Sequence, residues 1–273
     1  MNLEGSRAVI TGAGSGLGRA LCLELARHRA RVLVSDQDAA SARETARLVE
    51  QAGGKALVQR CDVTLPEQVE HLAETAFSQL GGVDLLVNNA GVACAGEVGQ
   101  LPLAEWKRVL DVNLWGVIHG CHSFVPRLRQ QGSGHILNIA SAAGLISVGY
   151  MAPYNVSKAA VVSLSETLYL ELKSAGIGVT VACPTFFRSN IAASAQYTDP
   201  TLGKAGTRLV DQARLGPEPV ARDLLRAVER RARYALPIAV GRWAWRLKRL
   251  SPDAFLYAML LLQKRVMKKT RTP

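Results

Sequence analysis

The chain has 273 residues, a formal net charge of +11 and 48% hydrophobic residues. This length suits one α/β domain, since such folds often reach about 200–250 residues. The five cysteines are odd in number, dispersed and without zinc-type or C-x-x-C spacing, so we expect buried free thiols and no metal site. The N-terminus lacks the pattern of a signal peptide, and no stretch approaches the roughly 20 apolar residues of a membrane span. We therefore expect a cytoplasmic protein.

Seven short apolar runs alternate with helical patterns through the first 240 residues. Such runs are typical of parallel strands that are covered on both faces, and the alternation predicts a doubly wound parallel α/β sheet. We expect one domain at residues 1–240 and a C-terminal helical extension at 241–273. The expected strands are Ala8–Thr11, Val32–Ser35, Ala56–Cys61, Leu85–Asn88, Ile136–Ala140, Val179–Cys183 and Leu236–Val240.

A glycine-rich turn follows the first strand and opens a helical pattern. Glycines in such a turn allow a pyrophosphate to approach the backbone closely, and the N–H groups of the helix N-terminus then bind it. A Walker-type loop is excluded, because Leu17-Gly18-Arg19 stands where Gly-Lys-Ser/Thr is needed. The turn therefore predicts a dinucleotide site. Its expected contact residues are Gly12, Ser15, Gly16, Leu17 and Gly18.

Asp36 stands at the end of the second apolar run. A carboxylate at this place accepts hydrogen bonds from ribose hydroxyls and would repel a 2′-phosphate. The neighbouring Gln37, and Ser15 in the turn, offer that phosphate no cation. These residues favour NAD over NADP as the cofactor.

Tyr154 and Lys158 lie four residues apart, with Ser141 thirteen residues upstream of the tyrosine. On a helix this spacing places both side chains on one face. A nearby ammonium lowers the pKa of a phenol, ordinarily about 10, and makes it a usable proton donor or acceptor. The alternative interpretation is a Tyr–Lys pair on a solvated helix face.

Together these motifs resemble those of the short-chain dehydrogenase/reductase family, in its compact single-domain branch, over roughly residues 5–240. The resemblance implies a Rossmann fold and an oxidoreductase that acts on a CH–OH group with a nicotinamide cofactor. The matching residues are the turn Thr11–Gly18, the element Asn88-Asn89-Ala90-Gly91, Asn113, Ser141, Tyr154 and Lys158.

The resemblance also implies a role for each site residue. Tyr154 exchanges the proton, Lys158 bonds the nicotinamide ribose and Ser141 bonds the substrate oxygen. Asn113 holds a water in a proton relay, and Asp62 reaches the adenine amino group. The alternative interpretations are that Ser141 closes a turn, that the backbone satisfies the buried amide of Asn113, and that Asp62 is an acid that precedes a helix. Further cofactor contacts are expected at Val63, Asn89, Ala90, Gly91, Pro184, Thr185 and Ser189.

One position departs from the family pattern. The family usually has Pro-Gly after the sixth strand, whereas this chain has Pro184-Thr185. Ser189 stands where a family threonine often bonds the nicotinamide amide and the cofactor phosphate. The replaced glycine affects the local backbone path rather than the fold.

The substrate class follows from two weakly polar segments. The stretch Ala142–Met151 is nearly free of charge, and in the family it lines the substrate pocket with the stretch after Pro184. The resemblance therefore implies a lipophilic alcohol or ketone of the steroid, retinoid or long-chain type. The alternative interpretation is that the residues of these two segments only pack in the core. The second stretch opens with Phe186, Phe187, Ile191, Ala192 and Ala193.

Residues 241–273 hold nine basic side chains against one acidic one, a net +8 of the chain's +11. The run Ala254–Leu262 is apolar around any helix and must be buried in something. Trp243, Trp245 and the flanking cations suit a bilayer interface, so we expect this tail to lie on a membrane surface without spanning it. The rival interpretation is a dimer arm, and no nucleic-acid motif accompanies the charge.

Three functions remain open at this point. The leading one is an NAD-dependent dehydrogenase or ketone reductase for a lipophilic substrate, and we expect a homodimer or homotetramer. A soluble 3-oxoacyl-carrier reductase is the first alternative, which Asp36 disfavours. A non-catalytic NAD-sensing protein is the second, although such proteins commonly lose the tyrosine that this chain keeps at Tyr154.

Overall fold

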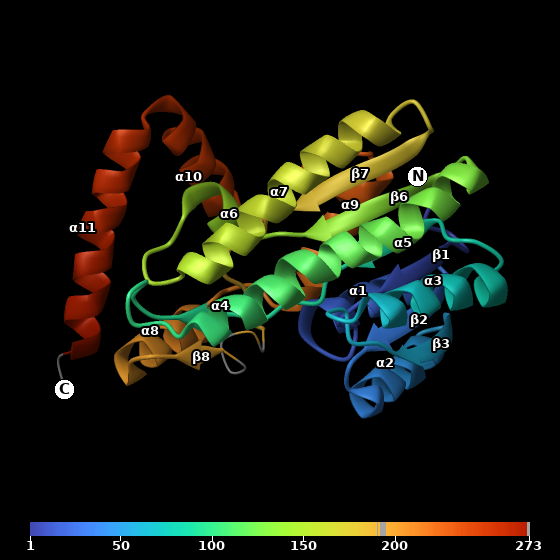
Figure 1. Ribbon diagram of the computed structural model, residues 1–273, viewed down its shortest axis with the longest axis horizontal. Coiled ribbons are helices and arrows are strands. Elements are labelled where there is room, and N and C mark those ends of the chain that lie inside the picture. Colours follow the sequence, from blue (N-terminus) through green and yellow to red (C-terminus); the bar gives the residue numbers. More distant parts are fainter. Residues whose placement is uncertain (190, 192–194, 272–273) are drawn as a thin grey trace.

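The computed structural model describes residues 1–189, 191 and 195–271, with side chains through residue 264. Its main sheet is parallel and seven-stranded, in the order β3-β2-β1-β4-β6-β7-β9 (Figure 1). The strands are β1 Arg7–Ile10, β2 Arg31–Asp36, β3 Lys55–Arg60, β4 Leu85–Asn88, β6 Gly134–Ile139, β7 Ile177–Ala182 and β9 Tyr234–Ala235.

Helices cover both faces of this sheet. Ile10 packs with α1 and α9 on one face, whereas the adjacent Val9 packs with α3, α5 and α7 on the other. The predicted doubly wound parallel sheet is therefore confirmed. The helices are α1 Gly16–Arg27, α2 Ala39–Gln51, α3 Pro66–Leu80, α4 Leu103–Leu110, π-helical η1 Asp111–Trp115, α5 Gly116–Gln131, α6 Ala143–Ile146, α7 Ala152–Leu172, α8 Pro200–Asp211, α9 Pro217–Glu229, α10 Ala239–Leu250 and α11 Pro252–Arg271.

Six expected strands are present, with ends shifted by a residue or two, but the seventh prediction was wrong. Leu236–Val240 is not a strand; the last strand is β9, Tyr234–Ala235, and α10 begins at Ala239. Pro237 has no N–H to donate and so cannot extend the ladder with β7. A small sheet of β5 Cys94–Ala95 and β8 Gln196–Tyr197 was not expected.

All five cysteines are free and buried, as predicted. In the part of the chain that the structure describes, no helix is long and apolar enough to cross a membrane.

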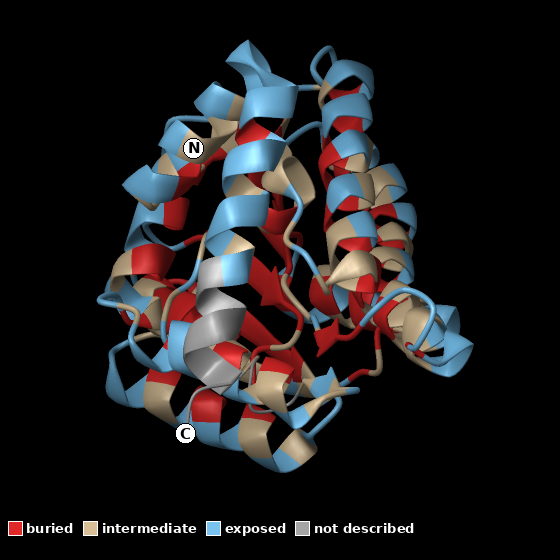
Figure 2. Cartoon of the chain, turned by 90° about the vertical axis from the view of Figure 1, so that its left-hand side faces the viewer, coloured by how far each residue is buried: buried red, intermediate tan, exposed pale blue. Residues whose placement is uncertain are grey.

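The two C-terminal helices lie at one end of the molecule, where α11 packs beside α10 and α8 (Figures 1 and 2). Within the run Ala254–Leu262, Phe255 is buried and Met259 is half-buried, whereas the other seven residues are exposed. The chain itself therefore leaves most of this apolar run uncovered. Arg265, Lys268, Lys269 and Arg271 contribute to the expected charge, but their side chains lie outside the described ones.

A buried histidine sits in the main sheet. His135 on β6 places Nε2 2.8 Å from Oγ1 of Thr180 on β7, and that hydroxyl donates to the carbonyl oxygen of Ala232 at 2.6 Å. Nε2 therefore carries the proton of a neutral ring. Nδ1 has no partner among the described residues, and a Cβ on Gly178 would collide with it. Burial lowers the pKa of His135 to about 3.

This pKa makes the fold sensitive to acid. An unfolded histidine titrates near about 6.5, so the stability that His135 contributes is complete above that pH. It is lost as the pH falls toward 3, by up to about 1.4 kcal/mol per pH unit. The free energy of unfolding, measured with urea at several pH values between these two, should fall less steeply with decreasing pH in His135→Gln than in the wild type. His71→Gln, at an exposed site, is the control. An equal pH dependence of the unfolding free energy in the wild type and in His135→Gln would contradict the assignment of this acid sensitivity to His135.

Candidate active site

The predicted site residues gather at the carboxyl ends of β1, β2, β4, β6 and β7. In a parallel sheet these ends share one edge, and ligands of doubly wound sheets bind in the crevice outside it. The sequence order and the sheet topology together therefore bring the separate motifs to one place.

The glycine turn requires glycine at particular positions. Gly12 has a φ of +62° and Gly16 a φ of +51°, values that favour glycine. A Cβ on Gly12 would come 2.7 Å from the Cα of Ala90, and a Cβ on Gly18 would collide with the carbonyl oxygen of Gly12. The side chain of Ser15 does not cap α1, so the first N–H groups of that helix face the turn without a side-chain acceptor.

The loop after β4 is fastened to this turn. The amide of Asn89 donates to the carbonyl oxygens of Thr11 and Gly12 at 2.8 and 3.0 Å. In return, Oγ1 of Thr11 accepts from the backbone N–H groups of Asn89 and Ala90 at 3.0 and 3.2 Å. Asn89, Ala90 and Gly91 therefore lie beside the glycine turn, and the side chain of Asn89 serves the loop geometry.

The carboxylate of Asp36 sits directly over the turn. It accepts from the N–H of Gly14 at 2.8 Å and from that of Asp38 at 3.0 Å. The guanidinium of Arg60 on β3 donates to the carbonyl oxygen of Gln37 at 3.1 Å. A cation thus lies next to this segment, contrary to the expectation from the sequence, because parallel pairing sets Arg60 opposite Asp36.

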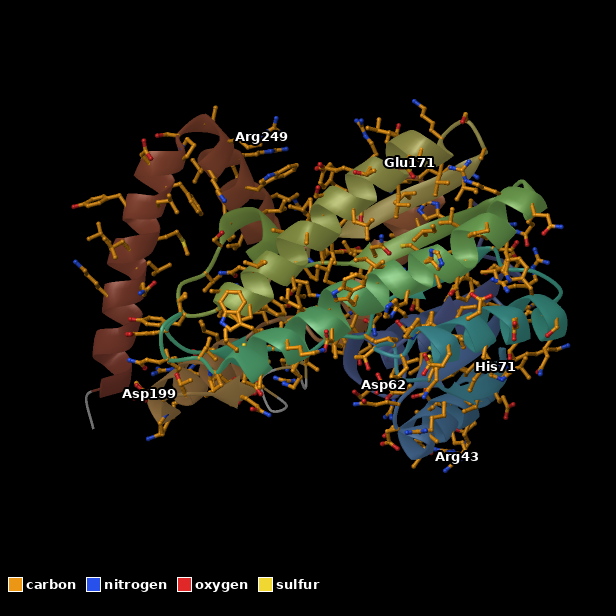
Figure 3. The ribbon with its side chains drawn as sticks, viewed as in Figure 1. Arg43, Asp62, His71, Glu171, Asp199 and Arg249 are labelled. Atoms are coloured by element: carbon orange, nitrogen blue, oxygen red, sulfur yellow. The ribbon has the colours of Figure 1, made fainter. Side chains whose placement is uncertain are left out.

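Asp62 has the contacts of an acid that precedes a helix. Its Oδ1 accepts from both the N–H and the hydroxyl of Thr64, at 3.0 and 2.8 Å, in the approach to α3 (Figure 3). The following Val63 is buried, and its carbonyl oxygen lies 2.9 Å from Nδ1 of His119. Asp62 and Val63 are therefore fixed between α3 and α5 at the rim of the site.

Asn113 is fully buried in the π-helical turn η1, between α4 and α5. Its amide exchanges two hydrogen bonds with the backbone of Val92, at 2.8 and 2.9 Å, and donates to Oγ of Ser157 at 3.2 Å. A Cβ on Gly91 would lie 3.3 Å from Oδ1 of Asn113 and 3.6 Å from Nζ of Lys158. Asn113 therefore ties the loop after β4 to α7, next to the lysine.

Ser141, Tyr154 and Lys158 come together between β6 and α7. Ser141 lies beside the phenol of Tyr154. Its Oγ donates to the carbonyl oxygen of Pro184 at 3.4 Å and accepts from the N–H of Ala143 at 3.1 Å. Nζ of Lys158 is buried and donates to the carbonyl oxygen of Ile139 at 2.8 Å. It lies 5.8 Å from the centroid of the Tyr154 ring.

The electrostatics differ from the expectation in one respect. Burial raises the pKa of Tyr154, and the neighbouring Ser141 hydroxyl only partly opposes this. The expected lowering by Lys158 was wrong, because the loss of water around the phenol dominates the shift. The ammonium itself donates to the Ile139 carbonyl oxygen. Burial also lowers the pKa of Lys158, to about 8. At neutral pH the tyrosine is therefore protonated and the lysine is charged.

The segment after β7 closes the site on another side. The carbonyl oxygen of Pro184 accepts from the N–H of Ala142 at 2.9 Å, and Thr185 has a negative φ, so the departure from Pro-Gly causes no backbone strain. Ser189 lines a cavity of about 430 Å³ with Gly16 and Arg188, beside the glycine turn.

Two further neighbours of the site were not predicted. No role was expected for Arg188, although a cation beside Ser189 in a segment expected to meet phosphate is a readable signal. Lys248 reaches helix α6 from 103 residues away, and no local sequence pattern predicts that contact. Phe186 is exposed and Phe187 packs on the core, whereas Ala192 and Ala193 lie outside the described residues.

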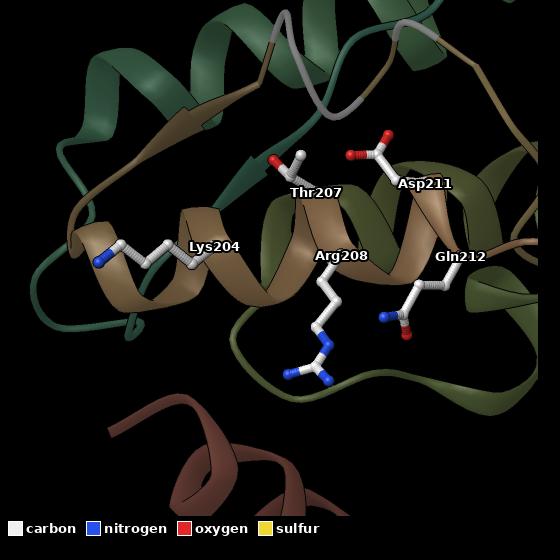
Figure 4. Close-up of a pocket in the computed structure, with 5 residues that line it drawn as sticks. All are labelled: Lys204, Thr207, Arg208, Asp211 and Gln212. Carbon is white, nitrogen blue, oxygen red and sulfur yellow. The ribbon is translucent and has the colours of Figure 1, made fainter. Parts of the chain in front are cut away.

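A second cavity, of about 490 Å³, lies along α8 (Figure 4). It contains none of the predicted site residues. Within the part of the chain that is described, His, Cys, Asp and Glu side chains form no metal-binding cluster. The residues that line this second cavity are Lys204, Thr207, Arg208, Asp211 and Gln212.

Comparisons with known proteins agree with this geometry. Residues 6–199 match the family model of the short chain dehydrogenases. The probable oxidoreductase EphD of Mycobacterium tuberculosis is 36% identical over 90% of this chain, which spans only 43% of that protein's length. The 3beta-hydroxysteroid dehydrogenase 1 of Eggerthella lenta is 37% identical over 81% of this chain and 85% of its own.

A solved structure is similar over nearly the whole chain. The short chain dehydrogenase/reductase of Burkholderia phymatum, in complex with NAD, has a TM-score of 0.88 and is 35% identical over 93% of this chain and 96% of its own. The motifs, their convergence at one sheet edge and these likenesses lead to the same conclusion. The chain belongs to the short chain dehydrogenase family.

Proposed function

We propose that this protein is an NAD-dependent oxidoreductase that transfers a hydride between nicotinamide and a lipophilic secondary alcohol or ketone. The observation that supports this best is the grouping of Ser141, Tyr154 and Lys158 between β6 and α7, with the Lys158 ammonium 5.8 Å from the tyrosine ring. The name of the hydroxysteroid dehydrogenase relative and the NAD complex of the structural neighbour favour the same substrate and cofactor class.

The proposed chemistry divides the work between cofactor and protein. Bound nicotinamide supplies or accepts the hydride. Tyr154, protonated at neutral pH, donates its proton to the carbonyl oxygen during reduction and takes it back during oxidation. Ser141 orients the phenol and the substrate oxygen. Asn113 holds the loop after β4 against α7. Lys158 is held on the end of β6, and its charge stabilises a phenolate as it forms.

We assign the cofactor preference to Asp36. Its carboxylate is anchored by the N–H groups of Gly14 and Asp38, which fixes a negative charge where a ribose 2′-phosphate would have to lie. Arg60 is nearby, but its guanidinium is engaged with the Gln37 carbonyl oxygen. The glycine turn would hold the pyrophosphate, together with Ser189, which shares a cavity with Gly16 of that turn.

We also propose that α10 and α11 rest on an anionic membrane surface. Their exposed apolar side chains stand among cations, and Asp253 is the only acidic residue of the chain beyond Gly241. An amphipathic face of this kind binds a bilayer through apolar burial and attraction to anionic lipids. The exposed large apolar side chains are Val240, Trp243, Leu247, Leu250, Leu256, Tyr257, Leu260, Leu261 and Leu262, and the exposed described cations are Arg242, Arg246, Arg249 and Lys264.

The first prediction from the proposed function concerns the tyrosine. Tyr154→Phe keeps the ring and removes the exchangeable proton, so the rate of alcohol oxidation should fall by about 10²–10⁴-fold. The affinity for NAD, measured by titration calorimetry, should be nearly unchanged. Steady-state formation of reduced cofactor checks the rate. A variant that keeps more than about a tenth of the wild-type rate would rule out this role for Tyr154.

The second prediction concerns cofactor choice. Asp36→Ser combined with Gln37→Arg removes the negative charge and adds a cation, so kcat/KM with NADP should rise relative to kcat/KM with NAD. Asp38→Ser removes a carboxylate two residues away and serves as the control, with the ratio expected to stay at the wild-type value. If the double variant also kept that ratio, the preference would be set elsewhere.

The third prediction concerns the C-terminal helices. The full-length protein should sediment with vesicles that contain phosphatidylserine, and added salt should weaken this binding, since charges are screened over about 10 Å at 0.1 M. Leu250→Ser should reduce the bound fraction. Leu103→Ser on α4 is the matched control, because the two leucines are 83% and 84% exposed. Failure to bind at low salt, with Leu250→Ser instead lowering the oligomeric state, would identify a dimer arm.

A further inference from the structure

The loop between α6 and α7 is conformationally strained. Ser147 has a φ of 42° and Tyr150 a φ of 64°, in the left-handed region that side chains other than glycine seldom occupy. Such residues persist only where the surroundings hold them in place. This loop connects Ser141, just before α6, with Tyr154 in the first turn of α7. Its conformation therefore bears directly on how the two side chains meet.

One anchor of this region comes from the C-terminal helices. Nζ of Lys248, on α10, donates to the carbonyl oxygen of Leu145 at 2.8 Å. Leu145 is in the last turn of the four-residue helix α6, where carbonyl oxygens have no partner within the helix. A cation is well placed there, because it satisfies the carbonyl and lies at the negative end of the helix.

The first turn of α10 packs on the same region. Gly241 is buried, and a Cβ on it would lie 2.7 Å from the Thr185 methyl and 3.8 Å from the Cβ of Ala142. Ala142 directly follows Ser141. Thr185, the residue that departs from the family pattern, thus fits against a glycine of α10. Further along this helix, the Trp245 ring lies 5.1 Å from the Tyr234 ring and keeps α10 on β9.

Other contacts hold the loop from the opposite side. The amide of Asn155 exchanges hydrogen bonds with the backbone of Val148, at 2.7 and 3.3 Å. Gly144 packs on the backbone of Lys158, since a Cβ there would lie 2.6 Å from the lysine carbonyl oxygen. Gln263 on α11 covers Gly149 so closely that a Cβ on the glycine would collide with it. The loop is therefore enclosed by α7, α10 and α11.

We propose that Lys248 is a positioning residue of the active site: through the Leu145 carbonyl oxygen it holds α6 and the strained loop against α7. This keeps Ser141 beside Tyr154 and shapes the wall that the substrate meets. The proposal rests on the proposed function for its catalytic consequence, but the mechanical link belongs to the fold alone. It makes α10 part of the active site rather than an appendage.

The test compares Lys248→Met with two other variants. Lys248→Arg keeps a donor that can reach the Leu145 carbonyl oxygen, and Lys55→Met removes the same charge from exposed β3. Hydrogen exchange of the amides at residues 143–151 is followed in the free protein. It should become several-fold faster in Lys248→Met and stay at the wild-type rate in the other two. Unchanged exchange in Lys248→Met would overturn the proposal, whatever the activity.

Kinetics then test the catalytic consequence. In Lys248→Met, kcat/KM for a bulky secondary alcohol should fall about tenfold or more, with a smaller fall for a small alcohol, because the pocket wall has loosened. NAD affinity should be unchanged, and Lys248→Arg should restore most of the rate. Faster exchange with unchanged kinetics would overturn the positioning role. If the wild type oxidises no alcohol, the proposed function fails, and the exchange data still decide whether Lys248 holds the loop.

Discussion

The Lys158 ammonium is the charge around which this site is arranged. Burial of a cation is costly, and here one carbonyl oxygen, that of Ile139, accepts its hydrogen bond at 2.8 Å. Several neighbours make room for it. Gly91 approaches Nζ from the loop after β4, and Gly144 packs on the lysine's own backbone. Burial of the ammonium lowers the pKa of Lys158 to about 8. A side chain so enclosed is well suited to hold a fixed charge near a reacting phenol.

Much of the fold could be predicted from the sequence, because parallel strands that are covered on both faces are short apolar runs. Each such run can be recognised from a few consecutive residues. The glycine turn, Asp36, Asn89 and Tyr154 were found for the same reason, since each belongs to a motif of a few residues. The last strand was misplaced because the apolar stretch runs through Pro237, and only the ladder with β7 shows where pairing stops.

What the sequence could not supply were contacts between distant segments. Arg60 reaches Gln37 through the register of two strands, and Lys248 reaches Leu145 across 103 residues. The direction of the Tyr154 pKa shift was also missed, because helical spacing says which residues share a face but not how far the phenol is buried. The fit of Thr185 against Gly241 explains how a departure from the family pattern is tolerated. It also shows that α10 packs closely against the segment after β7.

Hydride transfer to NAD from a secondary alcohol is the central claim, and isotopic substitution tests it most directly. The purified protein is incubated with NAD and steroid, retinoid or fatty alcohols, and reduced cofactor is followed by its absorbance. We expect at least one alcohol to be oxidised, more slowly when deuterium replaces the hydrogen on its carbinol carbon, with the deuterium recovered in the reduced nicotinamide. No reduced cofactor from any alcohol, with either NAD or NADP, or reduced cofactor without the label, would contradict the proposed reaction.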